Sequence, residues 1–125
     1  MPLIEVRGLW HTFPRSSGGN EPFSGLHDIS LDLDPGEFVV LAGPSGSGKT
    51  LLIRHLNGLL APTAGSISYA GAPLRNKLRE ARLDVGMVFQ DPDHQIIGQT
   101  VEEDIAFGPR NTGLGIEEVN RRVRA

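Results

Sequence analysis

Eight consecutive residues constrain this chain more than any other feature, because residues 43–50 read Gly-Pro-Ser-Gly-Ser-Gly-Lys-Thr. They match Gly-x-x-x-x-Gly-Lys-Ser/Thr, a loop whose backbone N–H groups surround the phosphates of a nucleotide. Glycines in such a loop can adopt positive φ, and their lack of a Cβ lets the backbone approach the phosphates closely. The pattern therefore predicts a site for a nucleoside triphosphate.

Each residue type in the loop has an expected role. Lys49 places a positive charge at the β and γ phosphates, and the Thr50 hydroxyl is expected to hold Mg²⁺. The predicted ligands are accordingly ATP and Mg²⁺. The residues expected to surround the phosphates have a short side chain or none: Gly43, Ser45, Gly46, Ser47 and Gly48.

The loop also needs a strand before it and a helix after it. Residues 38–42 form a short apolar run, which is typical of a strand buried in a parallel sheet. Residues 50–60 carry leucines at helical spacing, and Pro62 is expected to stop that helix. The helix N-terminus would then point at the phosphates and add its dipole to the site.

The remaining patterns predict an α/β fold, in which antiparallel strands surround a parallel core that holds the phosphate loop. Turn-forming residues at 14–22 predict a polar loop. Besides 38–42, the expected strands are 3–13, 29–34, 66–69 and 85–89, with a helical turn at 77–82.

Two helices are expected in the last quarter of the chain. Thr100 and Glu103 fit a capping box at the start of the first, and Gly108-Pro109 is expected to end it. The second runs from Ile116 to Arg124. Its support is expected from two pairs at i,i+4 spacing, Glu117 with Arg121 and Glu118 with Arg122.

Composition excludes several function classes. A length of 125 residues predicts one domain at most, and the absence of cysteine excludes disulfides and thiolate metal sites. The net charge of -3 argues against a nucleic-acid binder. There is no apolar run near the roughly 20 residues needed to cross a bilayer and no secretory signal, so we expect a soluble, cytoplasmic protein. The four histidines show no metal-ligand spacing: His11, His27, His55 and His94.

Two further stretches indicate which family of phosphate-loop proteins the chain resembles. Residues 88–95 read Val-Phe-Gln-Asp-Pro-Asp-His-Gln, and residues 100–111 read Thr-Val-Glu-Glu-Asp-Ile-Ala-Phe-Gly-Pro-Arg-Asn. Three other stretches fit with them: the phosphate loop, the opening Leu-Ile-Glu-Val-Arg-Gly-Leu at 3–9, and the run at 56–65. Together these stretches make the entire chain resemble the ABC transporter ATPases. Within that superfamily, the chain is most similar to the ATPases of energy-coupling-factor importers of the cobalt, nickel or vitamin type.

The resemblance implies roles for residues outside the loop. Phe13 falls where the family usually has a tyrosine that stacks on adenine. Gln90 falls where a glutamine contacts Mg²⁺ and the attacking water. Residues 93–103 would line the groove that receives a coupling helix of a membrane-spanning subunit. A second ATPase subunit would complete a dimer on the inner face of the cell membrane.

The same resemblance implies boundaries and missing parts. Residues 1–35 would be the antiparallel β part, 36–90 the core from phosphate loop to Gln90, and 91–125 the start of a helical subdomain. The family's Leu-Ser-Gly-Gly-Gln signature, its Walker B strand with Asp-Glu and its switch histidine do not follow Gln90. Residues 16–20 resemble the signature, but they precede the phosphate loop and run into Pro22. Residues 87–91 resemble the acidic strand, but Gln90 stands where the family has the Asp that holds Mg²⁺, and no Glu follows. We therefore expect ATP binding without efficient turnover.

Two other classes remain open from the residues. Gly-Pro-Ser-Gly also opens the phosphate loop of nucleotide kinases, although those enzymes begin almost at the loop, whereas here strands are expected before it. A non-catalytic nucleotide-binding module that regulates a partner is the third possibility.

Overall fold

A computed structural model describes residues 1–14 and 23–125, in an α/β fold. Most of the polar loop predicted at 14–22, and the signature-like segment 16–20, lie outside the described residues. The described chain divides into two units, Met1–Gly86 and Met87–Ala125, and each is described separately below. Within the described ranges no helix is both long and apolar enough to cross a membrane.

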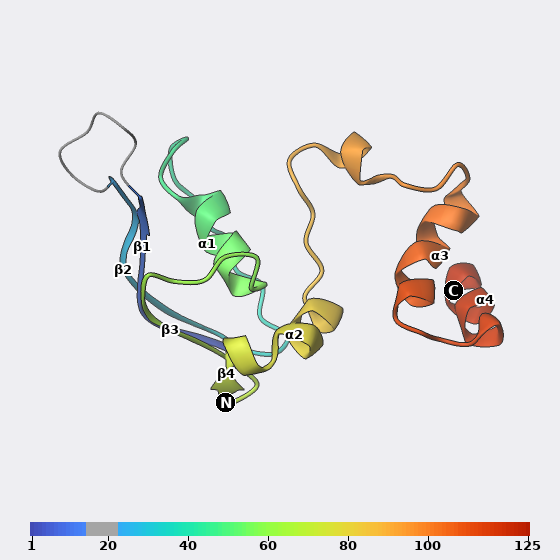
Figure 1. The fold of residues 1–125 in the computed structure, drawn as a ribbon, viewed down its shortest axis with the longest axis horizontal. Helices are drawn as coiled ribbons and strands as arrows, with labels where there is room; N and C mark the ends of the chain where they lie inside the picture. The colour runs from blue at the N-terminus through green and yellow to red at the C-terminus, as the bar shows by residue number, and fades with distance from the viewer. Residues whose placement is uncertain (15–22) are drawn as a thin grey trace. The chain divides into compact units, whose positions relative to one another are not determined.

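The first unit is built on a four-stranded antiparallel sheet in the order β2-β1-β3-β4 (Figure 1). The predicted strands at 3–13, 29–34 and 66–69 are confirmed, and the second of these starts earlier than expected. The strands are β1 (Ile4–Phe13), β2 (Phe23–Leu33), β3 (Ala64–Tyr69) and β4 (Ala72–Pro73).

Helix α1 (Lys49–Leu56) lies against this sheet and contributes Leu52 to its core. The helix after the phosphate loop is thus confirmed, but it ends at Leu56, four residues before the predicted end at residue 60. The backbone turns there: the amides of Leu59 and Leu60 both donate to the carbonyl of Arg54. A 3-10 turn η1 (Leu74–Asn76) and helix α2 (Leu78–Asp84) follow β4.

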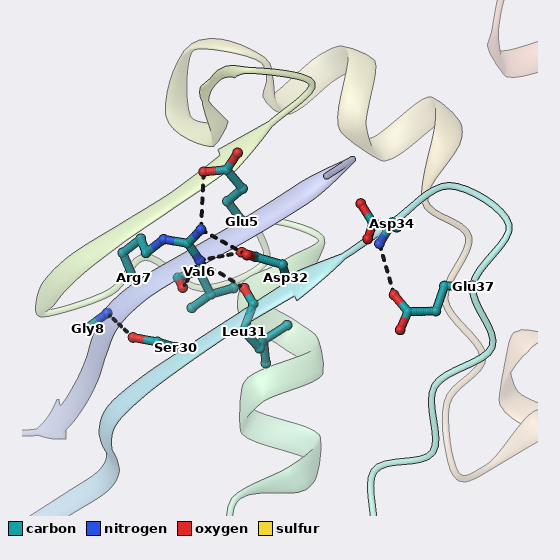
Figure 2. A network of polar contacts seen from close by, with 9 residues as sticks. All are labelled: Glu5, Val6, Arg7, Gly8, Ser30, Leu31, Asp32, Asp34 and Glu37. Atoms are coloured by element: carbon teal, nitrogen blue, oxygen red, sulfur yellow. Dashed lines mark hydrogen bonds and ion pairs between the residues drawn. The ribbon is translucent and has the colours of Figure 1, made fainter. Parts of the chain in front are cut away.

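A network of hydrogen bonds and ion pairs around Arg7 joins β1 and β2 on their exposed face (Figure 2). The guanidinium pairs with Asp32 on β2 and lies 3.6 Å from Glu5 Oε2. It also donates to the Val6 carbonyl at 3.0 Å. The hydrogen bond from Arg7 holds the pKa of Asp32 below its ordinary value. The network fixes the register of the two strands from the solvent side.

The two predicted core strands at 38–42 and 85–89 are wrong for the described residues. Both segments lack regular strand pairing, and most of their apolar side chains are exposed: Phe38 is 90% exposed and Val88 is 85% exposed, whereas Val85 packs against the core. A parallel strand obtains its hydrogen bonds from neighbouring strands. The described sheet is antiparallel and is formed by other parts of the chain. An apolar run alone cannot show whether such partners exist.

The second unit is helical, with a 3-10 turn η2 (Pro92–Gln95), α3 (Val101–Asn111) and α4 (Ile116–Arg124). The Thr100 half of the capping box is confirmed, because Thr100 Oγ1 accepts from the Glu103 amide at 3.2 Å. The Glu103 carboxylate reaches back one residue further than a capping box requires and accepts from the Gln99 amide at 3.0 Å. The predicted end at Gly108-Pro109 is wrong, because α3 continues to Asn111 with Pro109 inside its last turn.

Helix α4 has the predicted bounds, but one of its two expected pairs differs. Glu118 receives hydrogen bonds from both Arg121 and Arg122, so Arg121 pairs at i,i+3 with Glu118 and not with Glu117. The hydrogen bonds from these two arginines, those from Arg121 first, lower the pKa of Glu118 to about 2. Helices α3 and α4 pack together, with Ala106 and Val119 buried.

Candidate functional site

The phosphate loop of the first unit turns tightly into helix α1. The Ser47 amide donates to the Pro44 carbonyl at 3.2 Å, and the Leu52 amide donates to the Gly48 carbonyl at 2.9 Å. Gly46 and Gly48 have φ of 81° and 96°. Only glycine adopts this region at little cost. The sequence pattern therefore matches the backbone geometry at these two positions.

Helix α1 begins at Lys49, directly behind the loop, and no side chain of the described residues caps its first turn. The first turn of a helix presents N–H groups without partners inside the helix and carries partial positive charge. Thr50 lies in this turn with its side chain exposed. The loop and the helix start thus offer amide donors and a hydroxyl on one exposed surface.

Lys49 folds back over its own loop. Its Nζ donates to the carbonyls of Gly43 and Pro44, both at 2.7 Å, and to Ser47 Oγ at 3.2 Å. A Cβ at Gly43 would lie 2.9 Å from the same Ser47 Oγ. The ammonium is therefore already held inside the concave side of the loop. A phosphate oxygen placed there would replace these neutral acceptors with a charged one, which forms a stronger hydrogen bond.

The end of the loop is packed against strand β2 at Gly25. A Cβ on Gly48 would come within 2.9 Å of the Gly25 carbonyl. A Cβ on Gly25 itself would come within 2.6 Å of Leu51 Cδ2 and 2.7 Å of Phe13 Cε2. Gly25 therefore leaves room for Leu51 of α1 and for the Phe13 ring, which both lie close to its backbone. This close approach was missed from sequence, because Gly25 stands outside every motif.

Phe13 ends strand β1 within the same unit as the phosphate loop, and its side chain is 40% exposed. Its ring meets the His11 ring edge-on, with centroids 4.8 Å apart and an angle of 77°. The structure thus brings Phe13 near the start of α1 through Gly25. A half-exposed aromatic ring at this position can present a face to a planar ligand.

Gln90 belongs to the second unit and its side chain is exposed. The backbone before it is held in an extended form by Gln95: the Phe89 amide donates to Gln95 Oε1 at 3.1 Å, and Gln95 Nε2 donates to the Met87 carbonyl at 3.3 Å. The Gln95 amide thereby makes the two hydrogen bonds that a neighbouring strand would make. In the sequence, the only sign that Gln95 makes these hydrogen bonds is that a side-chain amide stands five residues after Gln90.

Asp104 ties the segment before α3 to the helix. Its Oδ1 accepts from the amides of Ile97 at 2.7 Å and Gly98 at 3.0 Å. These hydrogen bonds, that from Gly98 first, lower the pKa of Asp104 below its ordinary value. A Cβ on Gly98 would lie 2.4 Å from the Asp104 amide nitrogen, so the two backbones meet closely.

The lowered pKa of Asp104 predicts a pH dependence of the second unit. A carboxylate whose folded pKa lies below its unfolded value stabilises the fold above the unfolded pKa of about 3.9, and the stabilisation is lost as the pH falls. In an NMR titration, the Asp104 carboxyl carbon should titrate below that value, together with the amide protons of Ile97 and Gly98. Asp104→Asn should remove this shared transition.

Comparisons with known proteins agree on one family. The sequence model of the ABC transporter family matches residues 26–125. The chain is 52% identical over 101 residues to the energy-coupling factor transporter ATP-binding protein EcfA2 of Symbiobacterium thermophilum, covering 78% of this chain and 35% of the relative. It is 42% identical over 127 residues to the EcfA protein of Methanocaldococcus jannaschii, covering 99% of this chain and 43% of the relative.

Solved structures show the same fold. CbiO1 from Clostridium perfringens, described as part of the ABC transporter complex cbiONQ, aligns with a TM-score of 0.77 at 30% identity, over 96% of this chain and 47% of CbiO1. The ATP-binding cassette MJ0796, solved as a dimer with ADP and Pi, aligns with a TM-score of 0.78 at 26% identity, over 96% of this chain and 53% of that one. The chain spans less than half the length of the curated relatives named above. With four fifths of its residues matched by the family model, it belongs to the ABC transporter family of ATP-binding proteins.

Proposed function

We propose that residues 1–125 are the N-terminal part of the ATP-binding subunit of an energy-coupling-factor importer. In this proposal, the chain binds Mg·ATP at residues 43–50, and the whole protein uses ATP binding and hydrolysis to drive import of a small solute. The loop geometry carries the proposal: two glycines at positive φ, an uncapped helix start and a lysine folded over the concave side together fit a triphosphate.

The residues have separate proposed roles. Backbone amides of the loop and the Lys49 ammonium bind the phosphate oxygens, and the Phe13 ring stacks on the base. Thr50 and Gln90 are the proposed Mg²⁺ ligands, and Gln90 is also proposed to orient the attacking water. Mg²⁺, when bound, would neutralise charge on the β and γ oxygens. Among the described residues no cluster of three histidine or acidic side chains could hold a metal alone. A metal bound through the phosphates fits this donor set.

We propose that residues 1–125 alone bind ATP without efficient turnover. Hydrolysis in a dimeric ATPase of this kind needs a general base and a second phosphate-binding segment from the partner subunit, and residues 91–125 offer neither. Steady ATP hydrolysis by the purified chain, lost in a loop variant, would contradict this part of the proposal.

The proposed partners are a second ATPase subunit and a membrane-spanning subunit, which together would hold the chain at the inner face of the membrane. The segment from η2 to α3 supports the second partner. Acidic Glu102, Glu103 and Asp104 stand in the first turn of α3, next to exposed apolar side chains. These apolar residues are Ile96, Ile97, Val101, Ile105 and Phe107. Such a mixed surface suits a helix that carries both apolar and basic residues.

Calorimetry with Mg·ATP tests the core of the proposal. We expect heat of binding from the 125-residue chain with Mg·ATP and with inorganic tripolyphosphate, which carries the phosphates without a base. AMP is expected to bind at least tenfold more weakly than ATP, because most of the recognised charge lies on the β and γ phosphates. Phosphate transfer from ATP to a nucleoside monophosphate would favour a nucleotide kinase instead.

A substitution at Phe13 tests base recognition separately. Phe13→Ala should weaken Mg·ATP binding about tenfold, because stacking a base on an aromatic ring contributes roughly 1–3 kcal/mol. Phe13→Tyr retains the ring and should bind as the unaltered chain does. Tripolyphosphate affinity should be the same in all three proteins. If Phe13→Ala weakened both ligands equally, the ring would not contact the base.

A further inference from the structure

A buried histidine near the end of α1 links this helix, through His11, to Phe13. His55 is fully buried, which is unusual for a residue that can carry charge. Its Nδ1 lies 2.8 Å from the Leu51 carbonyl, and its Nε2 lies 3.1 Å from Nδ1 of His11. The His11 ring in turn meets the Phe13 ring. Three rings from two elements therefore form one continuous chain of contacts.

The partners fix which ring nitrogens carry hydrogen. A carbonyl can only accept, so His55 Nδ1 must donate to Leu51. Burial is the largest effect on the pKa of His55 and lowers it, against backbone hydrogen bonds to Leu51 and Ala61 that raise it. In the neutral ring that burial favours, with the hydrogen on Nδ1, Nε2 carries no hydrogen. His55 Nε2 is then an acceptor, and His11 Nδ1 must donate to it. The donation gives the His11 ring one orientation, with its plane set at 72° to that of His55.

Helix α1 also lies near Phe13 at a second residue, Leu51. Leu51, whose carbonyl holds His55, and the Phe13 ring both lie against the Cβ-free space at Gly25. Leu51 and His55 stand one turn apart on α1, and α1 starts at Lys49. The Phe13 ring therefore has two neighbours linked to this helix: the His11 ring, which contacts His55, and the Gly25 backbone, against which Leu51 lies.

We propose that His55 and His11 are positioning residues that hold the Phe13 ring in place for the nucleotide base. This inference rests on the proposed function, and it assigns these two histidines to base binding and not to phosphate binding. It predicts that changes at either histidine alter ATP affinity while tripolyphosphate affinity stays constant.

The variants are chosen to separate positioning from folding. His55→Leu keeps a similar apolar volume but removes the acceptor for His11, and His55→Gln restores a side-chain oxygen that can accept. His11→Phe keeps an aromatic edge for Phe13 but removes the donor, and His11 is only partly buried. His27→Leu is the matched control, because the His27 ring also contacts an aromatic ring, Trp10 at 3.7 Å, on the same sheet.

Calorimetry with Mg·ATP and with tripolyphosphate is the measurement. We expect His55→Leu and His11→Phe each to weaken ATP binding about fivefold, a part of the full stacking effect, with tripolyphosphate unchanged. His55→Gln and His27→Leu should bind ATP within twofold of the unaltered chain. If His55→Leu does not fold, as judged by circular dichroism, His11→Phe decides the question.

Two results would overturn the inference while the proposed function stands: equal weakening of both ligands, or no weakening of either. Absence of binding of both ligands by the unaltered chain would overturn the proposed function, and the inference with it. A readout independent of nucleotide is the ¹⁵N NMR spectrum of the histidine rings. Both His55 and His11 should show hydrogen on Nδ1 at neutral pH, and the opposite tautomer of His55 would contradict the assignment.

Discussion

Lys49→Ala is expected to weaken Mg·ATP binding by roughly 100-fold or more, the largest effect of any single substitution in the loop. Hydrogen bonds to charged groups contribute about 1.5–3 kcal/mol each, and the ammonium is expected to reach two phosphates. Lys49 is already held at the concave side of the loop by the Gly43 and Pro44 carbonyls. Binding therefore needs only an exchange of acceptors and no large movement of the backbone.

The chain offers a matched control for this experiment. Its second lysine, Lys77, is the N-cap residue of helix α2 and pairs with Glu80 at 2.6 Å. Lys77→Ala removes the same charge and should leave ATP affinity within twofold. Calorimetry of the two variants in one buffer compares the loss of the lysine in the loop with the loss of the same charge elsewhere on the chain. Similar weakening in both would mean that the triphosphate is held by general electrostatics and not at the loop.

Gly65→Ala is expected to have the largest effect on stability. Gly65 has φ of 84°, and a Cβ there would lie 2.0 Å from the Gly8 carbonyl oxygen and 2.6 Å from that of Arg7. Both contacts are with backbone of β1, the strand that pairs with β2 and β3. The methyl group can be accommodated only if β1 and β3 separate, so we expect a loss of more than about 3 kcal/mol.

Gly36→Ala separates the steric part of this loss from the backbone part. Gly36 has a similar φ of 78°, but a Cβ there meets nothing within 4 Å. Its cost should be about 1 kcal/mol, from the left-handed conformation alone. Urea unfolding followed by the fluorescence of the single tryptophan, Trp10 on β1, measures both variants. Equal losses in the two would show that the β1–β3 contact at Gly65 is not tight.

Much of the antiparallel sheet could be predicted, because its strands alternate. Ile29, Leu31 and Leu33 pack toward the core while their neighbours face solvent, as the period-two pattern requires. The bounds of α4 were equally visible from its charge spacing. These elements are specified within a few residues of sequence, so local periodicity is enough to find them.

The failures share a different physical origin. Segments 38–42 and 85–89 are apolar enough for buried strands, but a strand also needs backbone partners from elsewhere, which periodicity does not reveal. Pro109 was read as a helix end, although only one amide hydrogen bond is lost when proline occupies the last turn. The contact of His55 with His11 joins residues 44 positions apart and leaves no local pattern.

The exposed apolar segment at 38–41 also affects how the polypeptide behaves while it folds. Phe38 and Val40 are 90% and 73% exposed, and the loop that follows them is rich in glycine. An extended stretch of large apolar side chains without a covering layer is the kind of surface that folding chaperones bind during protein synthesis. The exposed run directly before the phosphate loop thus favours association of this polypeptide with other apolar surfaces.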